Sequence, residues 1–438
     1  MGIAHLEERV MEFESFSQAE SILLWSAFAV AVVMGAIVNK TNFCTMGAVS
    51  DVVNMGDYGR MRAWLLAMGV AMLGVTLLEF NGMISADDSF PPYRGSSLTW
   101  GENIIGGILF GIGMTLASGC GNKTLIRIGG GNIKSIVVFL VIAVIAYFMV
   151  NPFPGSDKTL FSELFFGWTR GQSGGSPLTI SLNTKQDLGS LLASGEGVAT
   201  ARFVIGSALS LLIMYFVFKS ADFRASLDNI LGGLVVGLCI IAVWWVSSNV
   251  KVNLDDEIYS LRSVAQQWDF LVEDSSQVKP ADTRPLSPQS YTFINPMGQT
   301  VGLAANGFSG KYMTFGIMAV LGVIFGSFLW AIFSKGFRIE WFANKKDFVN
   351  HFIGAILMGF GGVLALGCTI GQGVTGVSTL ALGSFFSFVS IVFGSAITMK
   401  TQFYMMVYEE EASFAKAVIT SLVDFKLLPS AMRKLDPV

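Results

Sequence analysis

Two stretches of the sequence resemble each other closely: FGIGMTLASGCGNK at Phe110–Lys123 and MGFGGVLALGCTIG at Met358–Gly371. Each is an apolar, glycine-rich segment that contains a Gly-Cys pair near its end. An ungapped alignment of residues 106–120 with residues 354–368 gives nine identities in fifteen positions, including both Gly-Cys pairs. This agreement is far above chance, and it indicates that the chain contains two homologous halves.

The composition around these stretches is typical of a membrane protein. Of the 438 residues, 52% are hydrophobic and only 13% are charged, whereas about a quarter are charged in typical soluble domains. The mean hydropathy is +0.60, and apolar runs near the ~20 residues needed to cross a bilayer recur along the chain. We therefore predict an all-α polytopic membrane protein with nine spans, at 21–39, 62–80, 103–120, 133–150, 198–218, 227–247, 311–333, 350–367 and 382–399.

The number of spans between the two copies sets their relative orientation. The copies end the third and the eighth span, so an odd number of steps separates them and they cross the membrane in opposite senses. This predicts an inverted-topology repeat of four, one and four spans, an architecture in which transporters place a pathway between two halves. The predicted parts are a first half at 1–197, a linking span at 198–226, a second half at 227–399 and a tail at 400–438.

The charges of the loops predict the orientation. Seventeen of the 28 Lys and Arg fall on one side, which places the N-terminus outside and the C-terminus in the cytoplasm. The long outer loops at 151–197 and 248–310 are either solvated connectors or a lid or partner site, and the second predicts a small helix around 255–272. The tail spaces four apolar residues on one helical face, which predicts an amphipathic helix on the inner membrane surface. These residues are Phe414, Val418, Leu422 and Phe425.

Glycine-rich stretches follow the Gly-Cys pairs, GNKTLIRIGGG at 121–131 and TIGQGVTGVS at 369–378, and a similar unit, NFCTMGAVSDVV, lies at 42–53. Such sequences do not suit a lipid-facing helix, so their backbone must be buried or line a cavity. We predict short re-entrant half-helices that meet near the midplane. Their N-termini would present free N–H groups and the positive end of the helix dipole to whatever lies between them.

Three of the four cysteines coincide with these breaks. A buried cysteine is usually only a small apolar residue, and this interpretation suits Cys239 within a span. Packing alone does not explain why Cys120 and Cys368 both stand at a turn, and Cys44 occupies a similar place. With two histidines and no close ligand spacing, the sequence predicts no metal site and no cofactor, and it has no basic patch for nucleic acid.

These residues together predict a pathway for a small anion with soft sulfur character. A thiol is a weak donor that can face a polarizable sulfur, while amide groups suit the oxygens, so thiosulfate fits on both counts. Lys123 either attracts the anion or anchors the chain at the cytoplasmic surface. The remaining predicted lining residues are Gly119, Gly121, Asn122, Gly367, Thr369 and Gln372, with Thr45 and Thr375.

At these motifs the sequence resembles the YeeE/YedE family of bacterial sulfur-compound transporters. The resemblance rests on NFCTMGAVSD, ASGCGNKTLIRIGGG and ALGCTIGQGVTGVSTLALGS. It implies an hourglass-shaped inverted repeat in the bacterial inner membrane, in which Cys44, Cys120 and Cys368 pass thiosulfate inward through S–H···S contacts without covalent intermediates. It also implies a small cytosolic sulfur-carrier protein as a partner.

The sequence departs from the family pattern and leaves alternatives open. Ile370 and Gln372 stand where family members often have Ser and His, and the outer loops are long. Sulfite, a selenium oxyanion or another sulfur species is therefore an alternative substrate. An alternative of a different class is a membrane enzyme or persulfide relay in which a cysteine is covalently sulfurated, and this would need an activated thiolate. A structural membrane subunit would leave the paired Gly-Cys turns unexplained.

Overall fold

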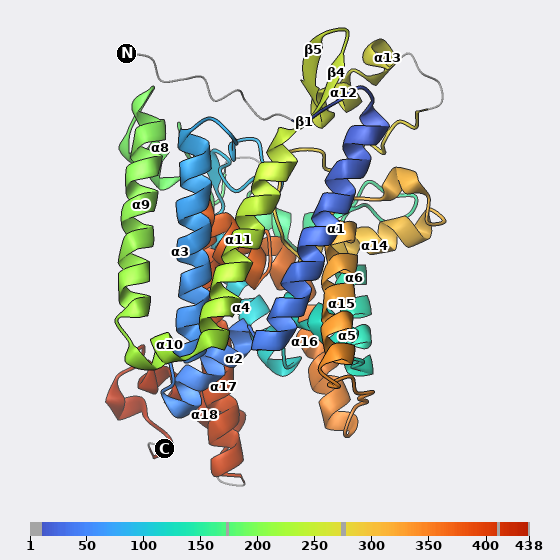
Figure 1. The fold of residues 1–438 in the computed structure, drawn as a ribbon. Coiled ribbons are helices and arrows are strands. Elements are labelled where there is room, and N and C mark those ends of the chain that lie inside the picture. Colours follow the sequence, from blue (N-terminus) through green and yellow to red (C-terminus); the bar gives the residue numbers. More distant parts are fainter. Residues whose placement is uncertain (1–10, 172–174, 273–276, 410–411, 437–438) are drawn as a thin grey trace.

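The computed structural model describes residues 11–171, 175–272, 277–409 and 412–436, and it is an all-α polytopic membrane protein (Figure 1). Within these residues, nine helical segments are long and apolar enough to cross a membrane, as the sequence predicts. The first ten residues of the predicted first half lie outside the described residues. The main helices are α1 (Phe16–Thr41), α3 (Gly59–Phe80), α4 (Trp100–Leu116), α6 (Ile133–Val150), α9 (Gly197–Phe218), α11 (Leu227–Asn249), α15 (Phe315–Phe333), α16 (Lys345–Leu364) and α17 (Leu382–Val407).

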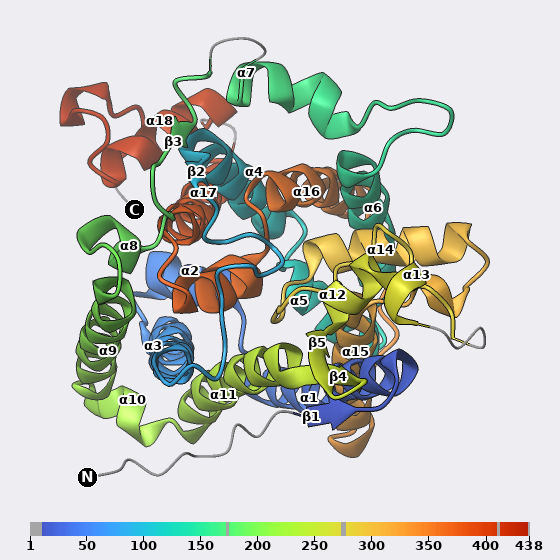
Figure 2. The same cartoon turned by 90° about the horizontal axis from the view of Figure 1, so that it is seen from above.

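Short, largely buried helices follow three of the long ones. Helix α2 (Thr45–Ser50) follows α1 and continues into a π-helical turn, η1 (Asp51–Met55). Helix α5 (Gly121–Gly129) follows α4, and the π-helical η4 (Gly371–Gly376) follows α16. A fourth short helix, α14 (Ile294–Ala305), comes from the long outer loop. Seen from above, α5 lies among the long helices, whereas α9 lies at the edge of the molecule (Figure 2).

The packing partners of the helices occur in matching pairs. Helix α1 packs against α15 as α11 packs against α3, and α4 packs against α17 as α16 packs against α6. The short helices follow the same scheme: α2 contacts α17 as α14 contacts α6, and α5 contacts α15 as η4 contacts α3. Helix α9 packs on α3, outside this scheme. A two-fold relation that exchanges α1–α6 with α11–α17 would produce this pattern.

The contact between α4 and α16 is reciprocal at the level of residues. A Cβ atom added to Gly106 would lie 2.6 Å from the backbone nitrogen of Ala365. In the opposite direction, a Cβ added to Gly354 would lie 2.7 Å from the backbone nitrogen of Ala117. The sequence alignment pairs Gly106 with Gly354 and Ala117 with Ala365, so the two contacts are equivalent. Glycine at these positions lets the two helix backbones touch, which is how small residues stabilise helix packing in membranes.

Two small sheets lie on the side of the molecule away from the C-terminal tail (Figure 1). Strand β1 (Met11–Phe13) pairs in parallel with β4 (Val250–Leu254), which pairs antiparallel with β5 (Glu257–Ser260), and β2 (Ser97–Leu98) pairs with β3 (Ile180–Ser181). The predicted helix around 255–272 is wrong at its start. Asp255 and Asp256 have positive φ and form the turn of the β4–β5 hairpin, so helix begins only at α12 (Leu261–Gln266) and α13 (Trp268–Leu271).

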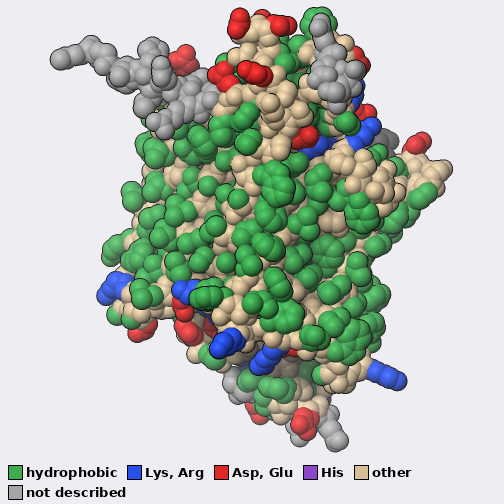
Figure 3. Space-filling view, turned by 45° about the vertical axis from the view of Figure 1, so that its right-hand side comes forward, with side chains coloured by type: hydrophobic (Ala, Val, Ile, Leu, Met, Phe, Trp, Pro, Cys, Tyr) green, Lys and Arg blue, Asp and Glu red, His purple; other side chains and the backbone are tan. Residues whose placement is uncertain are grey.

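The opposite side carries the tail and many of the basic residues. A broad band of hydrophobic side chains covers the middle of the face shown in Figure 3, and Lys and Arg side chains gather below it. Helix α18 (Phe414–Asp424) packs on α17 through small and polar residues that include Ala417 and Ser421. Of the predicted apolar face, Phe414 is exposed and Val418 and Leu422 are half-buried, whereas the Phe425 ring contacts Phe393 of α17 with centroids 6.5 Å apart, so this face touches α17 only at its C-terminal end. That this face rests on lipid stays a prediction.

Candidate functional site

Each of three cysteines begins a short helix. Cys44 and Cys120 are the N-cap residues of α2 and α5, and Cys368 directly precedes the helical residues 369–378 around η4. Their carbonyl groups accept the first helical hydrogen bonds, from the N–H groups of Ala48, Thr124 and Gln372 at 2.9, 2.9 and 2.8 Å. The predicted break at each of these cysteines is therefore present in the structure.

The three turns that carry the cysteines share one backbone geometry. Two residues before each cysteine stands a left-handed residue, Asn42, Ser118 or Leu366, with φ of 51°, 57° and 58°. In each turn the next N–H reaches back five residues to a helical carbonyl, in the pattern of a Schellman helix end. Only three or four residues thus separate the end of one helix from the start of the next. The chain builds the same corner three times, with a thiol at the same place in each.

The three corners converge inside the bundle. The Cys120 thiol is within electrostatic range of both Cys44 and Cys368, and it lies beside the Thr369 hydroxyl. All three cysteines are almost fully buried, at 5%, 1% and 0% exposure for Cys44, Cys120 and Cys368. Cys239 is also buried, but its sulfur lies 3.9 Å from the carbonyl of Val30, away from this cluster. Cys120 therefore lies between Cys44 and Cys368 in the cluster.

Polar atoms without partners surround the thiols. Burying a polar group without a hydrogen bond costs free energy, so such atoms need an explanation. In the described part of the chain, four of the predicted lining residues have a buried side-chain oxygen with no hydrogen-bond partner: Thr45, Asn122, Thr369 and Gln372. Thr375 differs, because its hydroxyl donates to the carbonyl of Tyr291 at 2.7 Å. The three glycines of the turns, Gly119, Gly121 and Gly367, leave room for neighbouring side chains.

Cations lie at the Cys44 end of the cluster. The Lys123 ammonium donates to Asn42 at 3.1 Å and is within electrostatic range of both Cys44 and Cys120. Arg60, at the start of α3, also interacts with Cys44, and it forms a two-pronged ion pair with the buried Asp51, with both hydrogen bonds at 2.5 Å. The sequence predictions did not include Arg60 or Asp51 in the site. Asp51 lies in the cysteine-bearing unit at 42–53. A single acidic residue in this otherwise uncharged unit is the feature of the sequence from which an ion pair at the site could have been predicted.

Comparison with known proteins assigns the chain to a family. A protein-family model described as "Sulphur transport" matches residues 40–397, which is most of the chain and includes all three cysteine corners. The chain belongs to the sulphur transport family. The thiosulfate transporter TsuA of Escherichia coli strain K12 is 22% identical to this chain over 387 residues, covering 85% of this chain and 92% of that protein. The thiosulfate transporter TsuA of Spirochaeta thermophila is 21% identical over 379 residues, covering 85% and 97%.

Proposed function

We propose that this sulphur transport family member is a thiosulfate transporter of the bacterial inner membrane and not an enzyme. The single observation that carries the proposal is the convergence of three buried thiols with unpartnered hydroxyl and amide oxygens. The resemblance to two proteins named thiosulfate transporters supports the choice of substrate. We further propose that the two sets of matching helices are inverted repeats, because their packing partners are equivalent.

The pathway runs from Cys368 through Cys120 to Cys44. A thiol presents its S–H to the polarizable terminal sulfur of thiosulfate, and hydroxyl groups such as that of Thr369 donate to the sulfonate oxygens. Because Cys120 interacts with both other thiols, the anion passes from one to the next without leaving the cluster. The cations Lys123 and Arg60 then lie at the exit and attract the negative charge. A small cytosolic sulfur-carrier protein receives it there.

The buried setting also explains selectivity. An anion that leaves water must regain its hydrogen bonds inside the protein, and the unpartnered polar atoms supply only a few of them. Thiosulfate differs from sulfate in one soft, weakly hydrated sulfur, which the thiols can face. Sulfite and selenium oxyanions are the competing substrates, and competition in uptake measurements ranks them.

Uptake of labelled thiosulfate into proteoliposomes tests the pathway. Cys120→Ser and Cys368→Ser each keep a small side chain but replace the soft S–H, and we expect both to lose at least about tenfold in uptake, or about 1.4 kcal/mol. Cys44→Ser should also lose uptake. Cys239→Ser is the matched control, since Cys239 is equally buried but lies outside the cluster, and it should transport like the wild type.

The same measurements separate transport from sulfur chemistry. If all four variants took up thiosulfate as fast as the wild type, the thiols would not carry the anion. A persulfide found by mass spectrometry on Cys120 or Cys368 after turnover would support a covalent relay in place of transport.

A further inference from the structure

An outer loop reaches down to the cysteine at the outer end of the pathway. Residues 81–99 join α3 to α4, and Tyr93 in this loop is buried, with 3% of its surface exposed. Its phenol is within electrostatic range of the Cys368 thiol. Among the residues that the structure describes, the Tyr93 hydroxyl has no hydrogen-bond partner. Because a buried hydroxyl without a hydrogen bond is unfavourable, a ligand that accepts a hydrogen bond from Tyr93 would explain its place beside the proposed pathway.

Tyr93 lines a narrow polar cavity of about 10 Å³, which has room for roughly one water. Gln372, one of the predicted pathway residues, lies on the same cavity. Its amide nitrogen donates to the carbonyl of Ala365 at 2.5 Å, while its oxygen lacks a partner within the described chain. Two other polar residues of the cavity have partners: Asn103 donates to Ser387 at 3.0 Å, and Gln186 accepts from the Gly383 N–H at 3.2 Å. Tyr93 therefore supplies an unused donor at the outer end.

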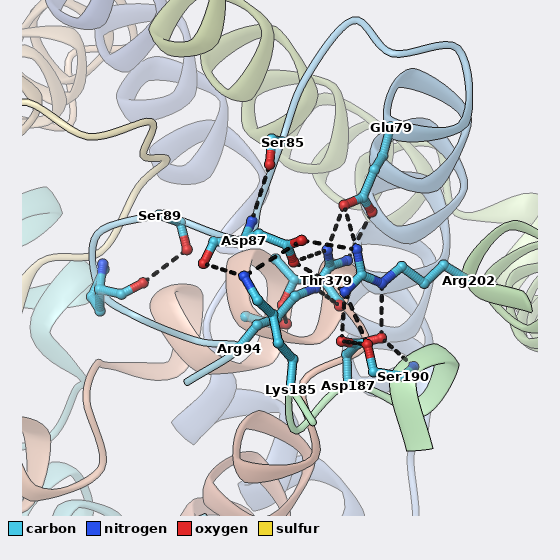
Figure 4. A network of polar contacts seen from close by, with 12 residues as sticks. Glu79, Ser85, Asp87, Ser89, Arg94, Lys185, Asp187, Ser190, Arg202 and Thr379 are labelled. Carbon is cyan, nitrogen blue, oxygen red and sulfur yellow. Dashed lines mark hydrogen bonds and ion pairs between the residues drawn. The ribbon is translucent and has the colours of Figure 1, made fainter. Parts of the chain in front are cut away.

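The residue after Tyr93 fixes the loop in place. The Arg94 guanidinium is fully buried, and its Nε donates to the carbonyl of Thr379 at 2.8 Å, just beyond the helix that Cys368 begins. The other nitrogens of Arg94 pair with Glu79 and Asp87 (Figure 4). Arg202 of α9 bonds to the same two acids. This network ties the loop to α3, to α9 and to the segment that follows the Cys368 helix, so the position of Tyr93 near Cys368 is fixed.

The protonation of Tyr93 suits a donor. Burial, with a smaller contribution from Cys368, raises the pKa of the phenol far above its usual value. The O–H is therefore kept at every physiological pH and can donate to an anion.

We propose that Tyr93 binds the substrate directly, donating a hydrogen bond to a sulfonate oxygen of thiosulfate as its sulfur meets Cys368. This inference rests on the proposed transport function and adds a specificity-determining residue from outside the cysteine motifs. The cavity is smaller than the anion, so its lining side chains must rearrange to admit it while Arg94 keeps the loop in place. Arg94 is the positioning residue, since it holds the loop and does not itself line the cavity.

Tyr93→Phe tests the proposal because it removes the hydroxyl and keeps the ring. We expect the apparent KM for thiosulfate to rise about tenfold, the effect of one lost hydrogen bond, with the maximal rate changed less than about twofold. Thiosulfate should raise the melting temperature of the purified wild type but much less that of the variant. Tyr259→Phe, on an outer strand, is the matched control and should keep the wild-type KM.

The stability of the empty variant is a second readout. Because the hydroxyl has no partner in the described protein, its removal should leave the melting temperature without thiosulfate unchanged or higher. A destabilised variant would show that the hydroxyl supports the fold, and an unchanged KM would show that it does not touch substrate. Either result overturns the inference. If Cys368→Ser still abolishes uptake in that case, the proposed function stands; if the wild type takes up no thiosulfate, both fail.

Discussion

Asp187 is a carboxylate with a fully buried side chain that pairs with Arg202. Burial alone would raise the pKa of Asp187, but hydrogen bonds from Arg202 and Ser190 and the charge of Arg94 outweigh it and lower the pKa to about 2. A lowered pKa stabilises the fold above the unfolded value near 4, and this stabilisation is lost as the pH falls towards 2. The Asp187 carboxylate therefore stays charged and paired with Arg202 down to about pH 5.

This network predicts the acid stability of the protein. The melting temperature of the wild type should be nearly constant from about pH 7 to pH 5 and should fall below about pH 4. Asp187→Asn should lose roughly 2 kcal/mol at pH 7 and should show a smaller further loss in acid. Thermal unfolding of the purified protein over this pH range measures both effects. Asp157→Asn, in the exposed part of an outer loop, is the control, and an equal acid loss in Asp187→Asn and wild type would contradict the prediction.

The site residues differ in how far the sequence predicts them. Cys120 and Cys368 are marked by their position in two similar segments, so the chain itself supplies the comparison. Arg60 and Tyr93 have no such marker, because they come from neighbouring segments and reach the thiols only through the tertiary fold. A basic residue at a predicted span end is also expected as a membrane anchor, and this hides the contact of Arg60 with Cys44.

At the scale of elements, the close contact of α4 with α17 depends on Gly111. A Cβ added to Gly111 would lie 2.2 Å from the backbone carbonyl oxygen of Ile391, which cannot move without shifting the helix. Gly111→Ala should therefore destabilise the protein by about 1–3 kcal/mol. The aligned Gly359 meets the side chain of Ile145 at 2.9 Å, and Gly359→Ala should cost less. Gly310→Ala, with no heavy atom within 4 Å in the described chain, is the control.

Thermal unfolding and the monodispersity of the three glycine variants on size-exclusion chromatography give the ranking. A Gly111 variant as stable as the Gly310 variant would show that α4 and α17 can separate freely. The helix positions themselves are predictable, since the nine predicted apolar runs correspond to the nine long apolar helices found among the described residues. The packing between them is not, because glycine permits a close contact without specifying its partner.

The elements of the outer loops are the least predictable. The sequence of residues 248–310 predicts a polar loop with one helical stretch. In the structure, part of this loop forms a hairpin that pairs with β1, more than two hundred positions away in the sequence. The same loop supplies α14, whose place on α6 matches that of α2 on α17. The sequence does not reveal this match, because α2 follows a cysteine, Cys44, whereas α14 follows Phe293.

At the scale of the whole molecule, the distribution of charge predicts the orientation in the membrane. The tail and α10 (Ala221–Ala225) lie on one side and the hairpin β4–β5 on the other (Figure 1). With the basic side in the cytoplasm, a fluorescent protein fused at the C-terminus should be bright in bacterial cells. Alkaline phosphatase inserted at the exposed Gly155 should be active. A dark C-terminal fusion together with an inactive phosphatase would reverse the orientation.

The threefold repetition of the cysteine corner has a consequence for the speed of conduction. In the proposed pathway, three sites with the same backbone geometry would offer the anion three wells of similar depth in its free-energy profile across the membrane. A single deep well would bind the anion tightly and release it slowly, whereas several shallow wells in series allow it to step from one to the next. The ends of the proposed pathway differ, with the Tyr93 phenol at one end and the Lys123 and Arg60 cations at the other, and in the proposed orientation this difference would favour movement of the anion inward. A protein built in this way would sacrifice affinity at any one site for a high rate of passage.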